Sequence, residues 1–244
     1  MAALTQAFDE RLAEVETYLD LLKVMEDLAQ KGPPKFEGAV SPITTQQKKI
    51  LYSSVYLQLY NLVESTMTRC IDAIADAART NPAWKAGDLT LALRTEWVRV
   101  TARTHIELTP QHRLESALAL CEHLVSSLPI GIFSIEKGGG GNWDDDAIEA
   151  ISYRLGVPLN VSPPVHSNVK RRVKDDLGPL RLVKQLRNEL AHGSISFTEC
   201  AEDVTVAWLV DLKDKTASYL REVVAHYVTY VETYEYLIPE KRPA

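Results

Sequence analysis

The sequence predicts an all-α protein, a bundle of about six to seven helices. Three long segments carry apolar residues at intervals of three and four, the spacing that places side chains on one face of a helix. Proline and glycine residues punctuate the chain between helical segments. The three apolar stripes are Leu12, Val15, Leu19 and Leu22; then Tyr52, Tyr56, Leu59, Val63, Met67, Cys70 and Ile74; and finally Leu209, Leu212, Tyr219, Val223, Tyr227, Tyr230 and Tyr234.

The first four helices follow from these stripes and from residues that stop or cap a helix. Gly32-Pro33-Pro34 ends the first helix, and the second runs on to Asn81-Pro82. Asp88 is expected to cap a third helix over residues 88–103, and a fourth spans residues 110–128. The tyrosines of the second helix could stack on bases, but their alternation with aliphatic residues favours core packing.

A glycine run over residues 138–141 leads into the next predicted helix. It lacks the Gly-Lys-Ser/Thr ending of a phosphate-binding P-loop, so we interpret it as a tight turn. A helix over residues 144–156 follows, with Asp144 or Asp145 as its cap. Residues 158–164 form a polar, proline-containing connection that is expected to be mobile.

The last third of the chain is predicted to hold two helices. One begins at Leu177 or Pro179 and ends at His192, with Leu182, Val183, Leu186 and Leu190 as its buried stripe. Residues 194–205 are expected to be irregular or strand-like, and the last helix covers residues 206–237. The second and last helices are expected to clamp the helix that ends at His192.

Composition and charge limit the classes of protein to which the chain can belong. With 244 residues, 45% hydrophobic and 25% charged, the chain is predicted to be one domain over residues 1–244. Residues 1–35 are a candidate accessory element for dimerisation or docking. The acidic N-terminal segment, the lack of a long apolar run and three scattered cysteines predict a cytoplasmic protein without a membrane span. No metal or cofactor is expected.

One short segment carries the chemistry of a metal-free ribonuclease. Arg187, Asn188 and His192 lie on one predicted helix that ends before Gly193. An arginine holds a phosphate, and an imidazole transfers a proton near neutral pH. Arginine, asparagine and histidine also occur near helix ends simply as caps and surface hydrogen-bonding groups.

The spacing of these residues raises a geometric question. Asn188 and His192 are four residues apart and share a helical face, whereas Arg187 and His192 project about 140° apart. Either Gly193 ends the helix and lets His192 turn, or a second copy of the motif completes the site across a dimer interface. Glycine suits the left-handed position just past a helix end.

A basic run leads into this motif. The net charge of −6 argues against nonspecific coating of nucleic acid. Between residues 170 and 187, however, seven basic residues face only Asp175 and Asp176, a local charge of +5. Such a run is usually a solvated helix face, but its position also suits RNA binding. The candidate RNA-binding residues are Lys170, Arg171, Arg172, Lys174, Arg181 and Lys184.

The motif resembles the Arg-x4-6-His motif of the HEPN superfamily, including the polar residue after its arginine. Further resemblance to a HEPN branch of prokaryotic conflict systems lies in three segments: Ala191–Phe197, Gly140–Asp145 and Leu59–Thr66. It spans roughly residues 45 to 236. The resemblance implies a HEPN-like helical bundle and a homodimer in which two Arg-to-His motifs face each other in one cleft.

The resemblance further implies a metal-independent endoribonuclease, with RNA as substrate and Arg187, Asn188 and His192 as catalytic residues. It suggests a toxin or antiphage-defence effector restrained by an antitoxin or other partner protein. Two alternatives stay open: a noncatalytic RNA- or protein-binding scaffold, and an enzyme that acts on nucleotides rather than polymeric RNA.

Overall fold

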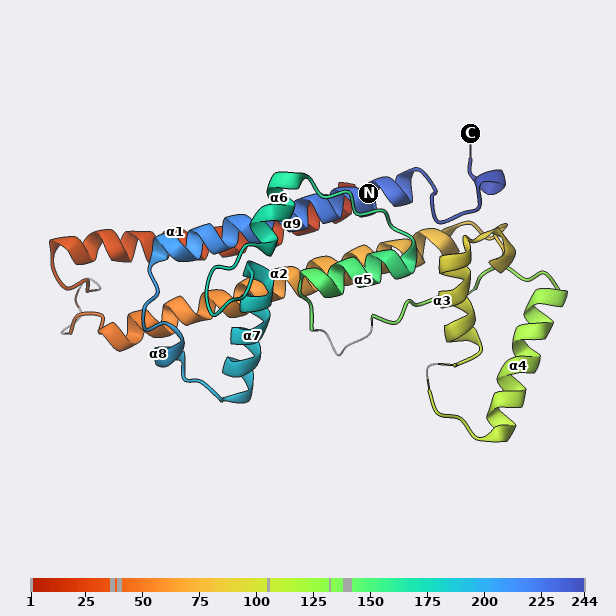
Figure 1. Cartoon of the computed structure of the whole chain (residues 1–244), viewed down its shortest axis with the longest axis horizontal. Helices are drawn as coiled ribbons and strands as arrows, with labels where there is room; N and C mark the ends of the chain where they lie inside the picture. Colours follow the sequence, from red (N-terminus) through yellow and green to blue (C-terminus); the bar gives the residue numbers. More distant parts are fainter. Residues whose placement is uncertain are drawn as a thin grey trace.

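The computed structural model describes residues 2–35, 38, 41–104, 106–131, 133–137 and 142–243. These residues form nine α-helices, eight of them with seven or more residues, and no strand (Figure 1). The prediction of an all-α bundle is therefore confirmed. The glycine run over residues 138–141, interpreted above as a tight turn, lies outside the described residues.

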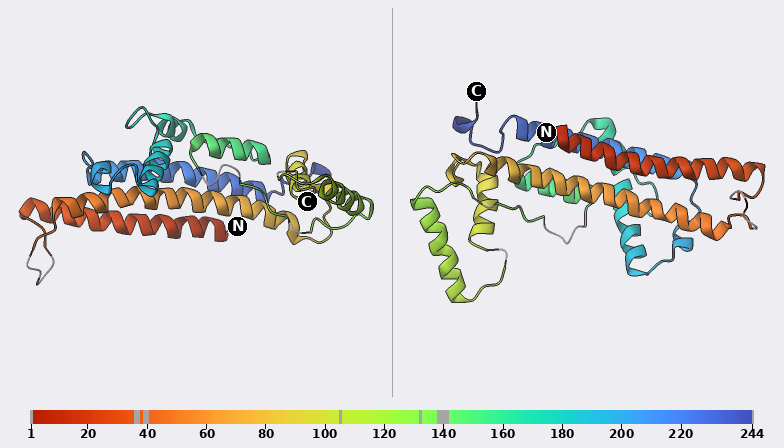
Figure 2. Two further views of the ribbon diagram at one scale, coloured as in Figure 1. Left: turned by 90° about the horizontal axis from the view of Figure 1, so that it is seen from below. Right: turned by 180° about the vertical axis from the view of Figure 1, so that it is seen from behind.

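Three long helices form the body of the molecule: α1 (Ala2–Lys31), α2 (Thr45–Thr80) and α9 (Val206–Glu232). They lie side by side in every view (Figures 1 and 2). Their predicted apolar stripes are buried, as the exposures of Leu22, Leu59 and Tyr227 at 0% show. Tyr234 is the exception, because it is only half-buried and lies beyond the end of α9. The side chain of Thr44 caps α2 and forms a capping box with Gln47.

Helix α1 contributes one apolar face to the core. It packs along both α2 and α9, and its seven buried side chains enter two apolar clusters. Ion pairs from Asp9 to Arg221 and from Glu16 to Lys213 tie its exposed edge to α9. A role for this helix in dimerisation or docking stays a prediction. The buried residues are Leu4, Phe8, Leu12, Val15, Leu19, Leu22 and Met25.

Helices α3 (Leu91–Thr101) and α4 (Pro110–Val125) project from one end of the bundle (Figure 1). The prediction that Asp88 caps α3 is wrong, because Thr90 accepts the hydrogen bond from the Leu93 N–H. Asp88 instead accepts from the Lys85 N–H and closes the short 3-10 helix η1 (Ala86–Asp88). Helix α4 leaves four apolar side chains at least half exposed: Leu114, Leu118, Leu124 and Val125.

Helix α5 (Asp145–Leu155) has the predicted cap. The side chain of Asp144 accepts a hydrogen bond from the Ala147 N–H, and Gly156 ends the helix with a left-handed φ of 76°. The connection expected over residues 158–164 is shorter than predicted, because α6 (Pro163–Lys170) begins within it. Proline fits the first turn of a helix, so Pro163 and Pro164 start α6.

Two boundaries near the end of the chain also differ from the prediction. Residues 194–205 are neither strand nor wholly irregular, because they contain the one-turn helix α8 (Phe197–Cys200). Ser196 and Glu199 form a capping box around it. Helix α9 ends at Glu232 rather than near residue 237, and Tyr234 adopts a left-handed φ of 55°.

Helix α7 (Pro179–His192) carries the motif and packs mainly against α2, with further contacts to α6, α8 and α9 (Figure 1). The predicted stripe Leu182, Val183, Leu186 and Leu190 is buried. Gly178 precedes the helix, and a Cβ atom there would lie 2.5 Å from the Val169 carbonyl oxygen. Only glycine allows this close approach, which fixes where α7 starts relative to α6.

Candidate active site

Arg187 is held against α2 by three neighbours. Its guanidinium carbon lies 4.1 Å from the centre of the Tyr60 ring, within the range of a cation–π contact. Its Nη1 donates to Oδ1 of Asn188 at 2.7 Å, and its Nη2 lies 3.5 Å from Oε2 of Glu64. The side chain retains 28% exposure, so the cation is fixed in place but still accessible.

Tyr60 supports this arrangement with the face of its ring. Its side chain is buried, and its hydroxyl accepts a hydrogen bond from the Trp143 N–H at 3.2 Å. Burial raises the pKa of Tyr60, an effect larger than the opposing influence of Arg187 and the Trp143 hydrogen bond. The ring therefore stays a neutral phenol whose face can stabilise the guanidinium.

Asn188 links the motif to the segment before α5. Its Nδ2 donates to Oδ1 of Asn142 at 3.1 Å, while its Oδ1 accepts from Arg187. The amide group thus bridges the cation to a residue 46 positions earlier in the chain. An amide with both ends engaged has a fixed orientation, which suits a group that binds or orients others.

His192 is the last residue of α7 and is exposed. Gly193 follows in the left-handed conformation, with φ of 72°, which confirms it as the residue that closes the helix. Within the part of the chain that the structure describes, the imidazole has no hydrogen-bond partner. Because α7 stays helical through His192, Arg187 and His192 project about 140° apart on one copy.

Most of the candidate RNA-binding cations form ion pairs, chiefly with acids of α5 and its cap. Lys170 Nζ lies 2.7 Å from Asp145, 2.9 Å from Asp146 and 2.9 Å from Glu149. Three more of the predicted cations form ion pairs, and two do not among the described residues. The pairs are Arg181–Asp146, Lys184–Asp144 and Arg172–Asp176; Arg171 and Lys174 are unpaired.

These ion pairs change the electrostatics that the local sequence suggests. Partial burial alone raises the pKa of Asp144, but the hydrogen bonds from Lys184 and the Ala147 N–H, with the nearby cationic charges, outweigh it and lower that pKa. Burial likewise lowers the pKa of Lys170, yet its hydrogen bonds to Asp145 and Glu149 raise it overall. Both groups are therefore charged at neutral pH.

The Asp144–Lys184 pair predicts a pH-dependent stability. Because the pKa of Asp144 is lowered on folding, its ionised form stabilises the fold above the ordinary value of 3.8, and this stabilisation is lost as the pH falls further. Asp144→Asn keeps a good helix cap but removes the charge. We expect it to lower the free energy of unfolding at pH 7 by about 1 kcal/mol.

Urea denaturation of both proteins at pH 7 and near pH 3 checks this expectation. The difference between wild type and Asp144→Asn should shrink at the lower pH, because the charge of Asp144 is progressively lost as the pH falls below 3.8 toward its lowered pKa. A difference that stays constant between the two pH values would show that the charge of Asp144 does not stabilise the fold.

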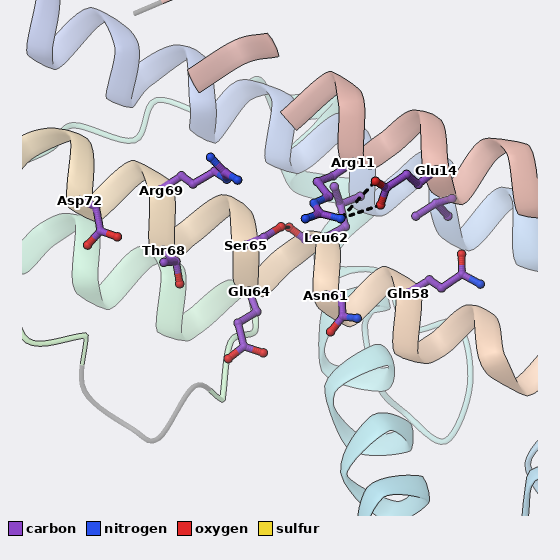
Figure 3. A pocket seen from close by; sticks show the side chains of 11 residues that line it. Arg11, Glu14, Gln58, Asn61, Leu62, Glu64, Ser65, Thr68, Arg69 and Asp72 are labelled. Carbon is purple, nitrogen blue, oxygen red and sulfur yellow. Dashed lines mark hydrogen bonds and ion pairs between the residues drawn. The ribbon is translucent and has the colours of Figure 1, made fainter. Parts of the chain in front are cut away.

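A groove lies between α1 and α2, next to the motif. It has a volume of about 580 Å³, and Figure 3 shows side chains of both helices around it. Glu64 lines the groove and also contacts Arg187, so the two sites share a residue. The lining residues are Arg11, Glu14, Val15, Gln58, Asn61, Leu62, Glu64, Ser65, Thr68, Arg69 and Asp72.

Sequence reasoning did not assign roles to Tyr60, Glu64 and Asn142, although all three lie in segments that carry the family resemblance. Tyr60 and Glu64 are four residues apart, which places them on one face of α2. This four-residue spacing is the feature of the sequence that could have indicated a shared role for the two residues. Neither residue reveals by itself that the face meets Arg187, since the contact joins α2 to a helix more than a hundred residues later.

The all-helical fold, with Arg187 and His192 on one helix, agrees with the expected HEPN class. Residues 1–236 match the family model described as HEPN_MAE_28990-like HEPN, and the chain belongs to this family. No curated protein and no solved structure shows significant similarity to it. None of the described helices combines the length and apolarity required to cross a lipid bilayer.

Proposed function

We propose that this HEPN protein is a metal-independent endoribonuclease. The observation that carries the proposal is the arginine of α7, which is fixed by Tyr60, Glu64 and Asn188 while its guanidinium stays accessible. A preorganised cation of this kind stabilises the negative charge that develops on a phosphate during cleavage. His192, exposed at the end of the same helix, supplies a group that transfers protons near neutral pH.

In the proposed reaction, the 2′-hydroxyl of RNA attacks the adjacent phosphorus. The 2′-oxygen loses its proton to His192 as general base and forms a bond to phosphorus, while the bond from phosphorus to the 5′-oxygen breaks. The leaving 5′-oxygen takes up a proton from a general acid. The products are a 2′,3′-cyclic phosphate and a 5′-hydroxyl. Arg187 stabilises the phosphorane, and Asn188 orients Arg187 or binds the phosphate.

The proposal includes a homodimer with the site at its interface. On one copy, Arg187 and His192 project in different directions from α7, as the helical spacing requires. Pairing two copies through this surface brings the arginine of one near the histidine of the other. The two histidines can then divide the roles of base and acid. We also propose that the protein acts as a toxin or antiphage-defence effector restrained by a partner protein.

Product mapping tests the proposed reaction. Purified protein is incubated with end-labelled RNA and with DNA of the same sequence, both in EDTA. We expect cleavage of RNA only, with 2′,3′-cyclic phosphate ends, because DNA lacks the attacking hydroxyl. Cleavage of DNA, or loss of activity in EDTA, would contradict the mechanism.

A noncatalytic binding role is the second candidate function. The exposed apolar residues of α4, among them Leu118 and Val125 at 59% and 83% exposure, favour a protein partner. The ion pairs that occupy Lys170 and Lys184 also reduce the positive charge available for RNA. Growth on expression distinguishes the two functions, because toxicity that disappears in His192→Ala supports the ribonuclease, and equal toxicity supports binding.

A further inference from the structure

An RNA strand with one phosphate at Arg187 must continue across the surface beside it. The basic run of α6 and α7 is poorly suited to hold the strand, because Lys170, Arg181 and Lys184 are paired with acids of α5 and its cap. The groove between α1 and α2 begins at Glu64, whose Oε2 lies 3.5 Å from Arg187 Nη2. We propose that this groove holds the single-stranded RNA that flanks the phosphate at Arg187.

This inference rests on the proposed ribonuclease function and specifies the path of its substrate. Arg69 is the residue assigned to a flanking phosphate. It lines the groove, it is exposed, and within the described part of the chain it forms neither an ion pair nor a side-chain hydrogen bond. An exposed guanidinium without a carboxylate partner is available to a phosphate, which it can bind through two parallel hydrogen bonds.

The acids of the groove do not oppose this assignment, because each is paired with a cation. Glu14 lies 2.8 Å from Arg11, and Asp72 lies 3.1 Å from Lys137. Glu64 is the neighbour of Arg187 described above. The groove and these partners together hold four cations and three anions, so the uncompensated positive charge belongs to Arg69.

The remaining polar side chains of the groove are neutral. Gln58, Asn61, Ser65 and Thr68 line it along α2, and Figure 3 shows Asn61 and Thr68 projecting outward from the helix. Such groups hydrogen-bond to sugars, phosphates and base edges without needing a counter-charge. From Asn61 to Asp72 the helix advances about 16 Å, a length that accommodates a few nucleotides of a single strand.

Charge reversal of Arg69 tests the path in a background that cannot cleave. His192→Ala protein is titrated with labelled single-stranded RNA at several salt concentrations, with and without Arg69→Glu. We expect Arg69→Glu to weaken binding about tenfold and to lower the salt slope by roughly one, the signature of a lost phosphate contact. Arg79→Glu is the control, because Arg79 is exposed on the same helix, pairs with Asp76 and lies outside the groove.

The outcomes separate this inference from the proposed function. Equal weakening by Arg69→Glu and Arg79→Glu, or no weakening by either, overturns the path, while cleavage by wild type still supports the ribonuclease. Absence of both RNA binding and cleavage in wild type overturns the proposed function and the path together. Thermal unfolding of each variant verifies that a loss of binding is not a loss of fold.

Discussion

Replacement of His192 by alanine is expected to lower the rate of RNA cleavage by about two to four orders of magnitude, the usual contribution of a general acid or base. The fold should be unaffected, because His192 is exposed at the end of α7 and packs in neither apolar cluster. Single-turnover cleavage of labelled RNA in EDTA measures the effect, and thermal unfolding verifies that the variant is folded.

His112→Ala provides a matched control for this experiment. His112 is also an exposed histidine, but it lies on α4, at the end of the bundle that projects away from α7 (Figure 1). We expect its replacement to leave cleavage unchanged. If His192→Ala cleaves as fast as wild type and His112→Ala, then His192 does not transfer the proton, and the assigned mechanism is wrong.

Replacement of Leu22 by alanine is expected to lower the free energy of unfolding by about 2–5 kcal/mol, as large-to-small substitutions in a packed core do. Leu22 has 0% exposure and packs in the cluster that also receives Leu186 and Leu190 of α7. Its loss therefore leaves a cavity in the apolar cluster against which the motif helix packs. Urea denaturation followed by circular dichroism measures the change.

Leu21, the residue before Leu22, offers a control substitution of the same type. Leu21 projects about 100° away from Leu22 around α1. It is 50% exposed, so Leu21→Ala should change the stability by no more than about 0.5 kcal/mol. The comparison also tests whether α1 belongs to the cooperative unit of the fold. Equal stabilities of the two variants would show that α1 unfolds separately, as an accessory element does.

The long helices could be predicted from the sequence because their apolar stripes repeat over many turns. Helices α6 and α8 could not, since 8 and 4 residues are too few to display a helical period. The cap of α3 was misplaced because Asp88 and Thr90 are both good capping residues, and only the tertiary structure selects between them.

The candidate site could be predicted only in part, because some of its contacts are local in sequence and others are not. Arg187, Asn188 and His192 form a local pattern, so their helix and its end at Gly193 could be predicted from the sequence. The contacts that hold Arg187 join segments far apart in the chain, and no local pattern reveals them. The ion pairs of the basic run could not be predicted either, because the acids that pair with Lys170 and Lys184 belong to α5 and its cap, far from the run in sequence.

The pairing of α1 with α9 also has a consequence for how the chain is made. Helix α1 leaves the ribosome before α9, yet part of the surface that it covers belongs to α9, which is translated after the motif helix. The apolar stripe of α7 packs in a cluster that includes Val206 and Leu209 of α9. A nascent chain therefore cannot complete the packing of the apolar stripe of α7 until α9 has emerged. For a protein proposed to cut RNA, this order of synthesis delays activity until the messenger has been read past the motif.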